Sequence, residues 1–163
     1  YLELQTKSKL SPLSPSTSHI IFAGHSLGGA LASIAALYFS CLFKYQENVE
    51  ISCLTLGSPK VGDSKFTELF NSKVKNSYRY VNDNDMIPYL PTSWSYQHVK
   101  GLTWFYQESI IYDFVPWRWF TPFTWNRIIK NIFLDLIGVG FSMFQDHSCQ
   151  EYIKDIQLNL TNS

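Results

Sequence analysis

Residues 18–31 read SHIIFAGHSLGGAL, and they combine a strand, a tight turn and the beginning of a helix. The apolar first half predicts a buried strand. Residues 24–28, Gly-His-Ser-Leu-Gly, match the G-x-S-x-G pattern of a nucleophile elbow, in which a serine stands at a sharp strand-to-helix turn. We expect such a turn to leave no room for side chains two positions before and after the serine, where Gly24 and Gly28 stand. The pattern predicts that Ser26 is a nucleophile.

The helix predicted after the turn covers residues 27–42. Gly29 and Ala30 lie in its first turns, and their small side chains would let the helix pack closely against a sheet. The Ser26 hydroxyl would then lie at a helix N-terminus. Unpaired N–H groups and the helix dipole stabilise a developing negative charge at that position.

The composition is that of a folded chain. With 163 residues and 45% hydrophobic residues, the sequence predicts a single domain over residues 1–163. The formal net charge of zero provides no basic surface for nucleic acid, so no nucleic-acid partner is expected. No run approaches the roughly 20 apolar residues that span a bilayer, and no signal peptide is visible. The compartment is left open.

The cysteines and the first residues add two expectations. Cys41, Cys53 and Cys149 show neither a metal-binding spacing nor a disulfide framework, and we expect Cys41 and Cys53 in the core. The sequence begins with Tyr1, and only residues 1–17 precede the predicted elbow strand. Because several strands precede the elbow in α/β-hydrolases, we expect a partial domain that lacks its N-terminal strands.

Strands and helices alternate after the elbow. Residues 49–56 and 77–81 are predicted strands, and a helix capped by Asp63 or Ser64 lies between them. This order predicts an α/β fold with a mostly parallel sheet flanked by helices. The remaining pattern predicts, in order, a hairpin from residues 96–99 and 102–106, an irregular aromatic segment over 107–125, an amphipathic helix over 126–136 and a last helix over 149–158.

A nucleophilic serine needs a base and an acid that holds the base. In an α/β-hydrolase the acid follows the serine along the chain, and the histidine follows the acid. Asp85 and its rival Asp83 both come just past the strand over 77–81, where a triad acid is expected, and the preference for Asp85 rests mainly on the family resemblance given below. The plainer interpretation is a turn whose Asn and Asp side chains bond their own backbone.

Four histidines are candidates for the base. His147 is favoured because it directly precedes the last predicted helix, in a loop that could return to the edge of the sheet. His98 lies inside the predicted hairpin and is expected to be structural. His25 points away from the serine, so a packing or hydrogen-bonding role is expected, and His19 opens the elbow strand as a surface residue.

Several stretches together resemble the class 3 (fungal-type) lipases, namely residues 24–31, 54–63, 79–91, 96–98 and 146–147. The resemblance implies a triad of Ser26, Asp85 and His147 that hydrolyses carboxylic esters of lipids without a metal or organic cofactor. It also implies that the N–H of Leu27 donates to the oxyanion and that Gly24, His25 and Gly28 form the elbow. The loop expected to give the second oxyanion donor, and the lid helix, are not recognised in residues 1–17.

Other functions keep the same residues. A phospholipase or a lipid acyltransferase would use the same triad, and a non-catalytic interaction module could retain the fold. Aromatic residues are concentrated in residues 107–144, where Trp117, Trp119 and Trp125 stand close together. We hypothesise that they line an acyl-chain pocket or contact a lipid surface. The alternative is that they form an irregular cap over the core.

Overall fold

A computed structural model describes residues 17–44, 46, 48–82, 85–106, 109–112 and 147–161. The helix predicted over 126–136 and the tryptophans of the aromatic segment lie outside the described residues. The elements in chain order are β1 (Ser18–His25), α2 (Leu27–Leu42), β2 (Val49–Leu56), α3 (Ser64–Lys73), β3 (Asn76–Asn82), the 3-10 helix η1 (Ile87–Tyr89), β4 (Leu102–Tyr106), β5 (Ser109–Tyr112) and α6 (Cys149–Thr161).

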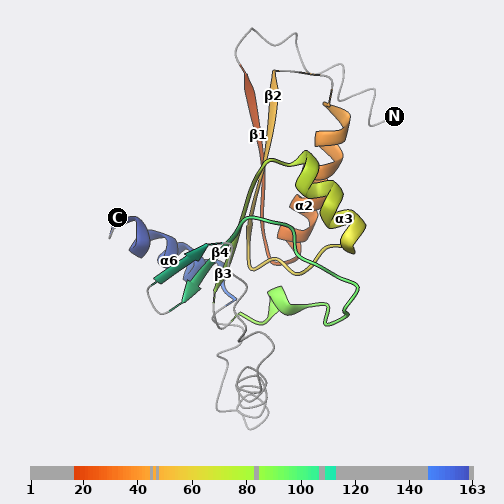
Figure 1. Cartoon of the computed structure of the whole chain (residues 1–163). Helices are drawn as coiled ribbons and strands as arrows, with labels where there is room; N and C mark the ends of the chain where they lie inside the picture. Colours follow the sequence, from red (N-terminus) through yellow and green to blue (C-terminus); the bar gives the residue numbers. More distant parts are fainter. Residues whose placement is uncertain are drawn as a thin grey trace.

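The strands of the described residues form a five-stranded sheet in the order β1-β2-β3-β4-β5. The first four strands pair in parallel, and β5 runs antiparallel to β4. The predicted α/β fold with a mostly parallel sheet is therefore confirmed. Because neighbouring parallel strands end at the same edge, the residues that follow β1, β2 and β3 meet there. In Figure 1 this edge is the lower end of the sheet, where α2 begins.

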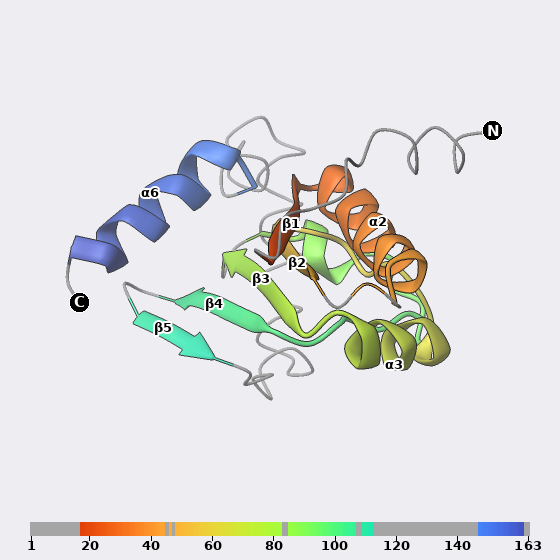
Figure 2. The same cartoon turned by 90° about the horizontal axis from the view of Figure 1, so that it is seen from above.

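Helices lie on both faces of the sheet. Figure 2 shows α2 and α3 on one face and α6 on the other. The main core lies beneath α2 and α3 and joins buried side chains of α2, α3 and β2 to three from the segments that follow α2, follow α3 and precede β4. Its members are Ala36, Phe43, Ile51, Cys53, Phe70, Val74 and Val99. A second buried cluster of Val81, Leu102 and Trp104 links β3 to β4. Apolar burial on this face holds the strands in register and fixes the edge that carries the site.

The helix boundaries follow local sequence signals. The Asp63 side chain caps α3 by accepting the N–H of Phe66 at 2.9 Å, so the cap is Asp63 rather than Ser64. The long helix α2 starts directly after Ser26 and has no charged residue along its length. No helix in the described part of the chain is both long and apolar enough to cross a membrane.

The predicted hairpin is wrong. Residues 96–99 form no strand, and Gln97 makes only an isolated bridge with Gly62. The hairpin is instead made by β4 and β5, so part of the segment predicted to be irregular is a strand. The physical reason is burial, because residues 102–105 are all buried and such a strand needs neighbours on both sides. Gly101, with φ 87°, turns the chain so that β4 enters beside β3.

The prediction for the cysteines is half correct. Cys53 is buried in β2, and burial raises the pKa of its thiol. Cys41 is exposed near the end of α2. Apolar residues occur on every face of α2, so the sequence pattern alone does not show which face of the helix packs against the sheet.

Candidate active site

Ser26 stands at the tip of the turn between β1 and α2. Its φ of 57° and ψ of −130° make it the one residue other than glycine with positive φ among the described residues. Such a conformation costs energy and persists only where the surrounding structure fixes it. Here the Ser26 N–H donates to the carbonyl of Leu56 at 2.9 Å, which ties the turn to β2. The serine is therefore presented at the carboxyl edge of the sheet.

The glycines of the turn differ in what they do. A Cβ on Gly24 would lie 2.1 Å from the carbonyl oxygen of Gly28, so a side chain is impossible there. At Gly28 itself a Cβ would meet nothing within 4 Å, so the expected steric requirement at this position is wrong. The crowded neighbour is Gly29, where a Cβ would lie 2.7 Å from that of Ser58. The Gly28 backbone lies against Gly24 of β1, whereas a side chain on Gly28 itself would point into open space.

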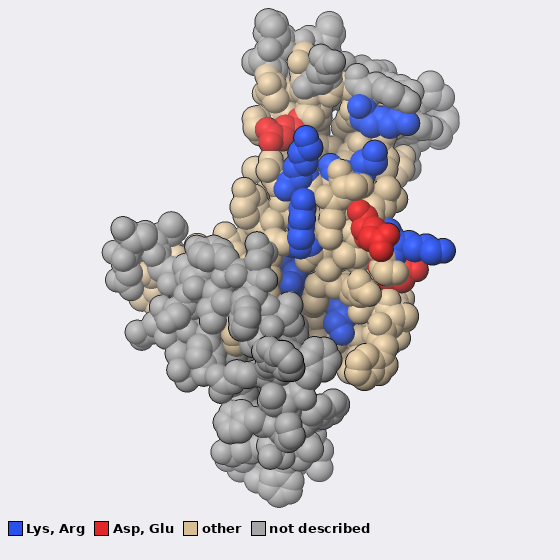
Figure 3. All heavy atoms as spheres, in the orientation of Figure 1, with Lys and Arg blue, Asp and Glu red and all other residues tan. Residues whose placement is uncertain are grey.

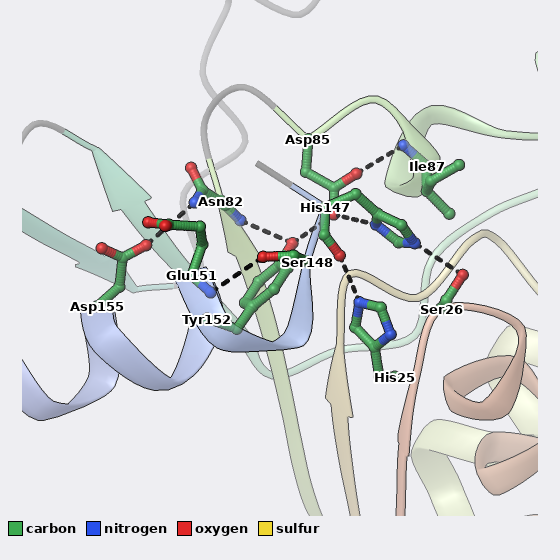
Figure 4. A network of polar contacts seen from close by, with 10 residues as sticks. All are labelled: His25, Ser26, Asn82, Asp85, Ile87, His147, Ser148, Glu151, Tyr152 and Asp155. Atoms are coloured by element: carbon green, nitrogen blue, oxygen red, sulfur yellow. Dashed lines mark hydrogen bonds and ion pairs between the residues drawn. The ribbon is translucent and has the colours of Figure 1, made fainter. Parts of the chain in front are cut away.

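His147 links the serine to a buried carboxylate, as Figure 4 shows. Its Nε2 lies 2.7 Å from Ser26 Oγ, and its Nδ1 lies 2.8 Å from Asp85 Oδ2. An ionised carboxylate can only accept, so Nδ1 carries the proton and Nε2 accepts the serine hydroxyl. The side chain of His147 is 13% exposed and that of Asp85 is fully buried. The three residues that the sequence selected are thus joined in one hydrogen-bonded chain.

The Asp85 carboxylate is held by three donors from three parts of the structure. Its Oδ1 accepts the N–H of Ile87 at the start of η1, at 2.8 Å. Its Oδ2 accepts the hydroxyl of Tyr152 at 2.6 Å as well as Nδ1 of His147. A buried charge is tolerated only with such partners. The orientation of the carboxylate is therefore fixed before any substrate binds.

Two residues of this network were missed in the sequence. Tyr152 of α6 is fully buried, and its oxygen also accepts the N–H of Asn82 at 3.0 Å. Burial and the charge of Asp85 raise the pKa of Tyr152, so its hydroxyl stays a neutral donor. Gly57 has φ 57°, and a Cβ there would lie 2.5 Å from Asp85 Oδ2. Tyr152 gave no signal in the sequence, because an aromatic residue in a helix ordinarily indicates core packing. Gly57, directly after β2, could have indicated a close approach of the backbone to the site.

His25 contacts the backbone of His147. Its Nε2 donates to the backbone carbonyl of His147 at 2.6 Å, and the centroids of the two rings lie 4.5 Å apart. The contact is of the packing and hydrogen-bonding kind expected for this residue. Figure 4 shows the His25 ring beneath His147, bonded to the backbone of that residue rather than to the ring nitrogen that faces Ser26. His25, the first x of the G-x-S-x-G pattern, therefore contacts the backbone of His147.

The other candidates lie elsewhere. His98 Nε2 donates to the carbonyl of Pro88 at 2.7 Å, and burial with the nearby cation of Arg79 lowers the pKa of His98 well below its ordinary value. His19 is exposed and lies 3.1 Å from the Glu50 carboxylate. Asp83 is outside the described residues. Among the residues that the structure describes, no cluster of three His, Cys, Asp or Glu side chains could hold a metal ion.

A parallel sheet that presents a serine at a strand-to-helix turn, beside a histidine and a buried carboxylate, is the arrangement of an α/β-hydrolase. The sequence profile of the family described as Lipase (class 3) matches residues 2–94, more than half of the chain. The chain belongs to the class 3 lipase family. The matched range contains Ser26 and Asp85 and ends before His147.

The chain is similar to several named proteins. The secreted mono- and diacylglycerol lipase 1 of Fusarium solani is 32% identical over 89 residues, which is 54% of this chain and 25% of the relative. The lipase of Rhizomucor miehei is 34% identical over 94 residues, 55% of this chain and 25% of the relative. The crystal structure of the lipase from Rhizopus microsporus var. chinensis is 28% identical, with a TM-score of 0.48, covering 62% of this chain and 34% of that one. The chain thus spans about a quarter of the length of each of these two curated relatives.

Proposed function

We propose that this chain carries the catalytic centre of a lipase, which hydrolyses carboxylic ester bonds of lipids such as acylglycerols. Ser26 is the nucleophile, His147 the general base and Asp85 the residue that orients the base. The observation that carries the proposal is the unbroken chain of hydrogen bonds, with 2.7 Å from Ser26 Oγ to His147 Nε2 and 2.8 Å from His147 Nδ1 to Asp85. Both distances are within reach for proton transfer.

In the first half of the reaction Ser26 Oγ attacks the ester carbonyl carbon while Nε2 of His147 takes the hydroxyl proton. The carbonyl oxygen becomes an oxyanion at the start of α2. The N–H of Leu27, at the first helical position, has no acceptor within the helix, and we assign it as a donor to this oxyanion. The tetrahedral intermediate then collapses, and His147 returns the proton to the departing alcohol oxygen. An acyl-enzyme ester on Ser26 remains.

In the second half water attacks the acyl carbon and gives a proton to Nε2 of His147. The intermediate collapses, the proton passes back to Ser26 Oγ and the fatty acid leaves. Asp85 stabilises the imidazolium that forms in each half and keeps the proton on Nδ1. In the general serine-hydrolase scheme, Asp→Asn at this position lowers kcat by about four orders of magnitude. These steps need no metal and no organic cofactor.

The choice of lipid esters rests on the family. The Fusarium relative is a mono- and diacylglycerol lipase, and we extend acylglycerol substrates to this chain as part of the proposal. A lipid ester is accordingly the expected partner, and peripheral contact with a lipid surface belongs to the same proposal. The zero net charge supports no role with nucleic acid.

The test compares hydrolysis of p-nitrophenyl esters of short and long acyl chains by the chain and by Ser26→Ala. Ser72→Ala is the matched control, because the hydroxyl of this exposed serine donates to the carbonyl of Leu69 within its own helix, α3. We expect Ser26→Ala to abolish activity and Ser72→Ala to retain it. A fluorophosphonate probe should add its mass to the peptide containing Ser26 in the wild type and in Ser72→Ala.

The results separate the alternatives. Preference for long acyl chains supports a lipase, and preference for short ones an esterase that is not lipid-directed. A folded chain that neither hydrolyses any ester nor reacts with the fluorophosphonate probe would refute the proposal and favour a non-catalytic interaction module. Equal activity of Ser26→Ala and the wild type would exclude Ser26 as the nucleophile.

A further inference from the structure

His98 lies outside the proposed triad, on a backbone that is fixed on both sides of it. The N–H of Gln97 donates to the carbonyl of Gly62 at 2.8 Å, and Val99 is buried in the main core. The carbonyl of Val99 also accepts the Nε–H of Arg79, a buried residue of β3, at 3.3 Å. His98 therefore extends from a segment that is tied to the chain after β2 on one side and to β3 on the other.

The His98 ring supplies a hydrogen-bond donor that η1 lacks. Pro88, in the middle of η1, is fully buried, and in a 3-10 helix its carbonyl would accept the N–H three residues further along the chain. That residue is Pro91, which has no N–H. Nε2 of His98 donates to the Pro88 carbonyl instead, at 2.7 Å. A buried carbonyl without a donor is costly, so this bond stabilises η1 in its place.

The His98 ring is a neutral donor. Burial and the cation of Arg79, with a smaller contribution from Lys60, hold the pKa of His98 well below its ordinary value, although the bond to Pro88 acts in the opposite direction. Lys100 adds a cation at the end of α3, where Figure 3 shows Lys and Arg side chains, in blue, gathered in a column. A carbonyl oxygen only accepts, so the single N–H of the neutral ring is on Nε2, facing η1.

The first residue of η1 bonds the Asp85 carboxylate. The N–H of Ile87 donates to Asp85 Oδ1 at 2.8 Å, and Figure 4 shows this donor directed at the carboxylate. η1 is only three residues long, and a single 3-10 turn has little stability of its own. His98 holds its centre, and the N–H of Lys60 donates to the carbonyl of Leu90, just after it, at 2.8 Å. Loss of the bond at the centre would let the Ile87 N–H move away from Asp85.

We propose that His98 is a positioning residue for the triad and acts through η1. Its bond to the Pro88 carbonyl keeps the Ile87 N–H directed at Asp85. Asp85 in turn orients the His147 ring. Three hydrogen bonds form the path, from His98 to Pro88 at 2.7 Å, from Ile87 to Asp85 at 2.8 Å and from His147 to Asp85 at 2.8 Å. The inference rests on the proposed function and adds a residue that affects the rate without touching the reacting atoms.

Two substitutions separate the donor from the bulk of the ring. His98→Gln keeps an N–H donor near the position of Nε2, whereas His98→Leu fills the space and removes the donor. His98→Asn, whose shorter amide does not reach the Pro88 carbonyl, takes the place of His98→Leu if that variant does not fold. His19→Leu is the matched control, because His19 is an exposed histidine at the end of β1 away from Ser26. Circular dichroism and urea unfolding identify conditions in which every variant is folded.

The rates of p-nitrophenyl ester hydrolysis over a range of ester concentrations give kcat and KM. A displacement of about 1 Å in a catalytic group can cost about a hundredfold in rate, so we expect His98→Leu to lower kcat by about ten- to hundredfold with KM unchanged. His98→Gln should stay within about threefold of the wild type, and His19→Leu should match it. In the Asp85→Asn background His98→Leu should lower kcat no further, since its path ends at Asp85.

A spectroscopic measurement tests the path without catalysis. The Nδ1 proton of His147, in its bond to Asp85, should give a downfield proton NMR signal that Asp85→Asn removes. We expect His98→Leu to shift or broaden this signal, and His98→Gln and His19→Leu to preserve it. If the wild type hydrolyses no ester, the proposed function fails, and the NMR signal still decides whether His98 positions Asp85.

Several outcomes would overturn the inference. In the kinetics they are a kcat of His98→Leu equal to that of the wild type, equal losses in His98→Gln and His98→Leu, a rise in KM at unchanged kcat, and an equal loss when His98→Leu is added to the wild type and to Asp85→Asn. In the NMR experiment it is an unchanged His147 signal in the folded His98→Leu protein.

Discussion

Removing a single oxygen from Tyr152 should loosen the site and the fold together. The side chain is fully buried, and its hydroxyl donates to Asp85 Oδ2 at 2.6 Å while accepting the N–H of Asn82 at 3.0 Å. Tyr152→Phe keeps the ring and deletes only these two interactions. The Asp85 carboxylate retains its other two donors, so the variant is a mild perturbation of the carboxylate rather than its removal.

The size of the effect follows from the two lost bonds. A hydrogen bond to a charged group contributes about 1.5–3 kcal/mol to stability, and an orphaned buried N–H costs about 1–3 kcal/mol. Both share one oxygen and are not additive, so we expect Tyr152→Phe to lower the free energy of unfolding by about 2–4 kcal/mol. A domain stable by about 5–15 kcal/mol survives this loss. The rate of ester hydrolysis should fall, but by less than in Asp85→Asn.

Urea unfolding followed by circular dichroism measures the stability, and p-nitrophenyl ester hydrolysis measures the activity. Tyr38→Phe is the control, since Tyr38 is 55% exposed and its variant should lie within about 0.5 kcal/mol of the wild type. A double-mutant cycle with Asp85→Asn should show coupling between the two residues. The reasoning fails if Tyr152→Phe costs less than about 0.5 kcal/mol, or if the effects of the two substitutions simply add.

Three further predictions concern other parts of the structure. Gly57→Ala should abolish activity in an ester assay, because its Cβ would lie 2.5 Å from Asp85 Oδ2, and positive φ alone should cost roughly 1–2 kcal/mol on urea unfolding. Burial holds the pKa of His98 well below 6.5, so the unfolded chain takes up a proton before the folded chain does, and the free energy of unfolding should fall as the pH drops below 6.5. Urea unfolding at pH 7.5 and 5.5 measures this dependence, which His98→Gln should flatten. In the folded chain Cys41 should react quickly with a thiol reagent and Cys53 only on unfolding, as peptide mapping of the labelled thiols would show.

The first half of the fold could be predicted because local signals and tertiary structure agree there. The predicted bounds of α2 and β2 match those of the structure, since the elbow turn fixes the start of the helix and a polar turn separates the helix from β2. The hairpin was mispredicted because residues 96–99 have a strand-like pattern but form separate hydrogen bonds with different segments instead of pairing with one strand. His98 donates to Pro88, and Gln97 bonds Gly62. Periodicity cannot detect such non-local partners.

The site was predictable to the extent that chain order determines it. Ser26 comes from a motif, and the order of acid and histidine in this fold points to Asp85 and His147, which the structure brings into hydrogen-bond contact. The supporting residue Tyr152 could not be found in this way, because its contact with Asp85 joins positions 67 residues apart and depends on the face of the sheet that α6 covers. The preference between Asp85 and Asp83 came mainly from family resemblance.

The contacts of α6 have a consequence for how the molecule would lose activity. His147 lies immediately before this helix, and Tyr152 and Asp155 within it bond Asn82 at the end of β3. A molecule in which α6 detaches would keep its sheet and Ser26. It would lose the His147 base, the Tyr152 hydroxyl that orients Asp85 and the geometry of the Asp85 carboxylate in one step. The proposed ester hydrolysis would then disappear in mild denaturant before the secondary structure melts, so that the activity reports on the docking of α6.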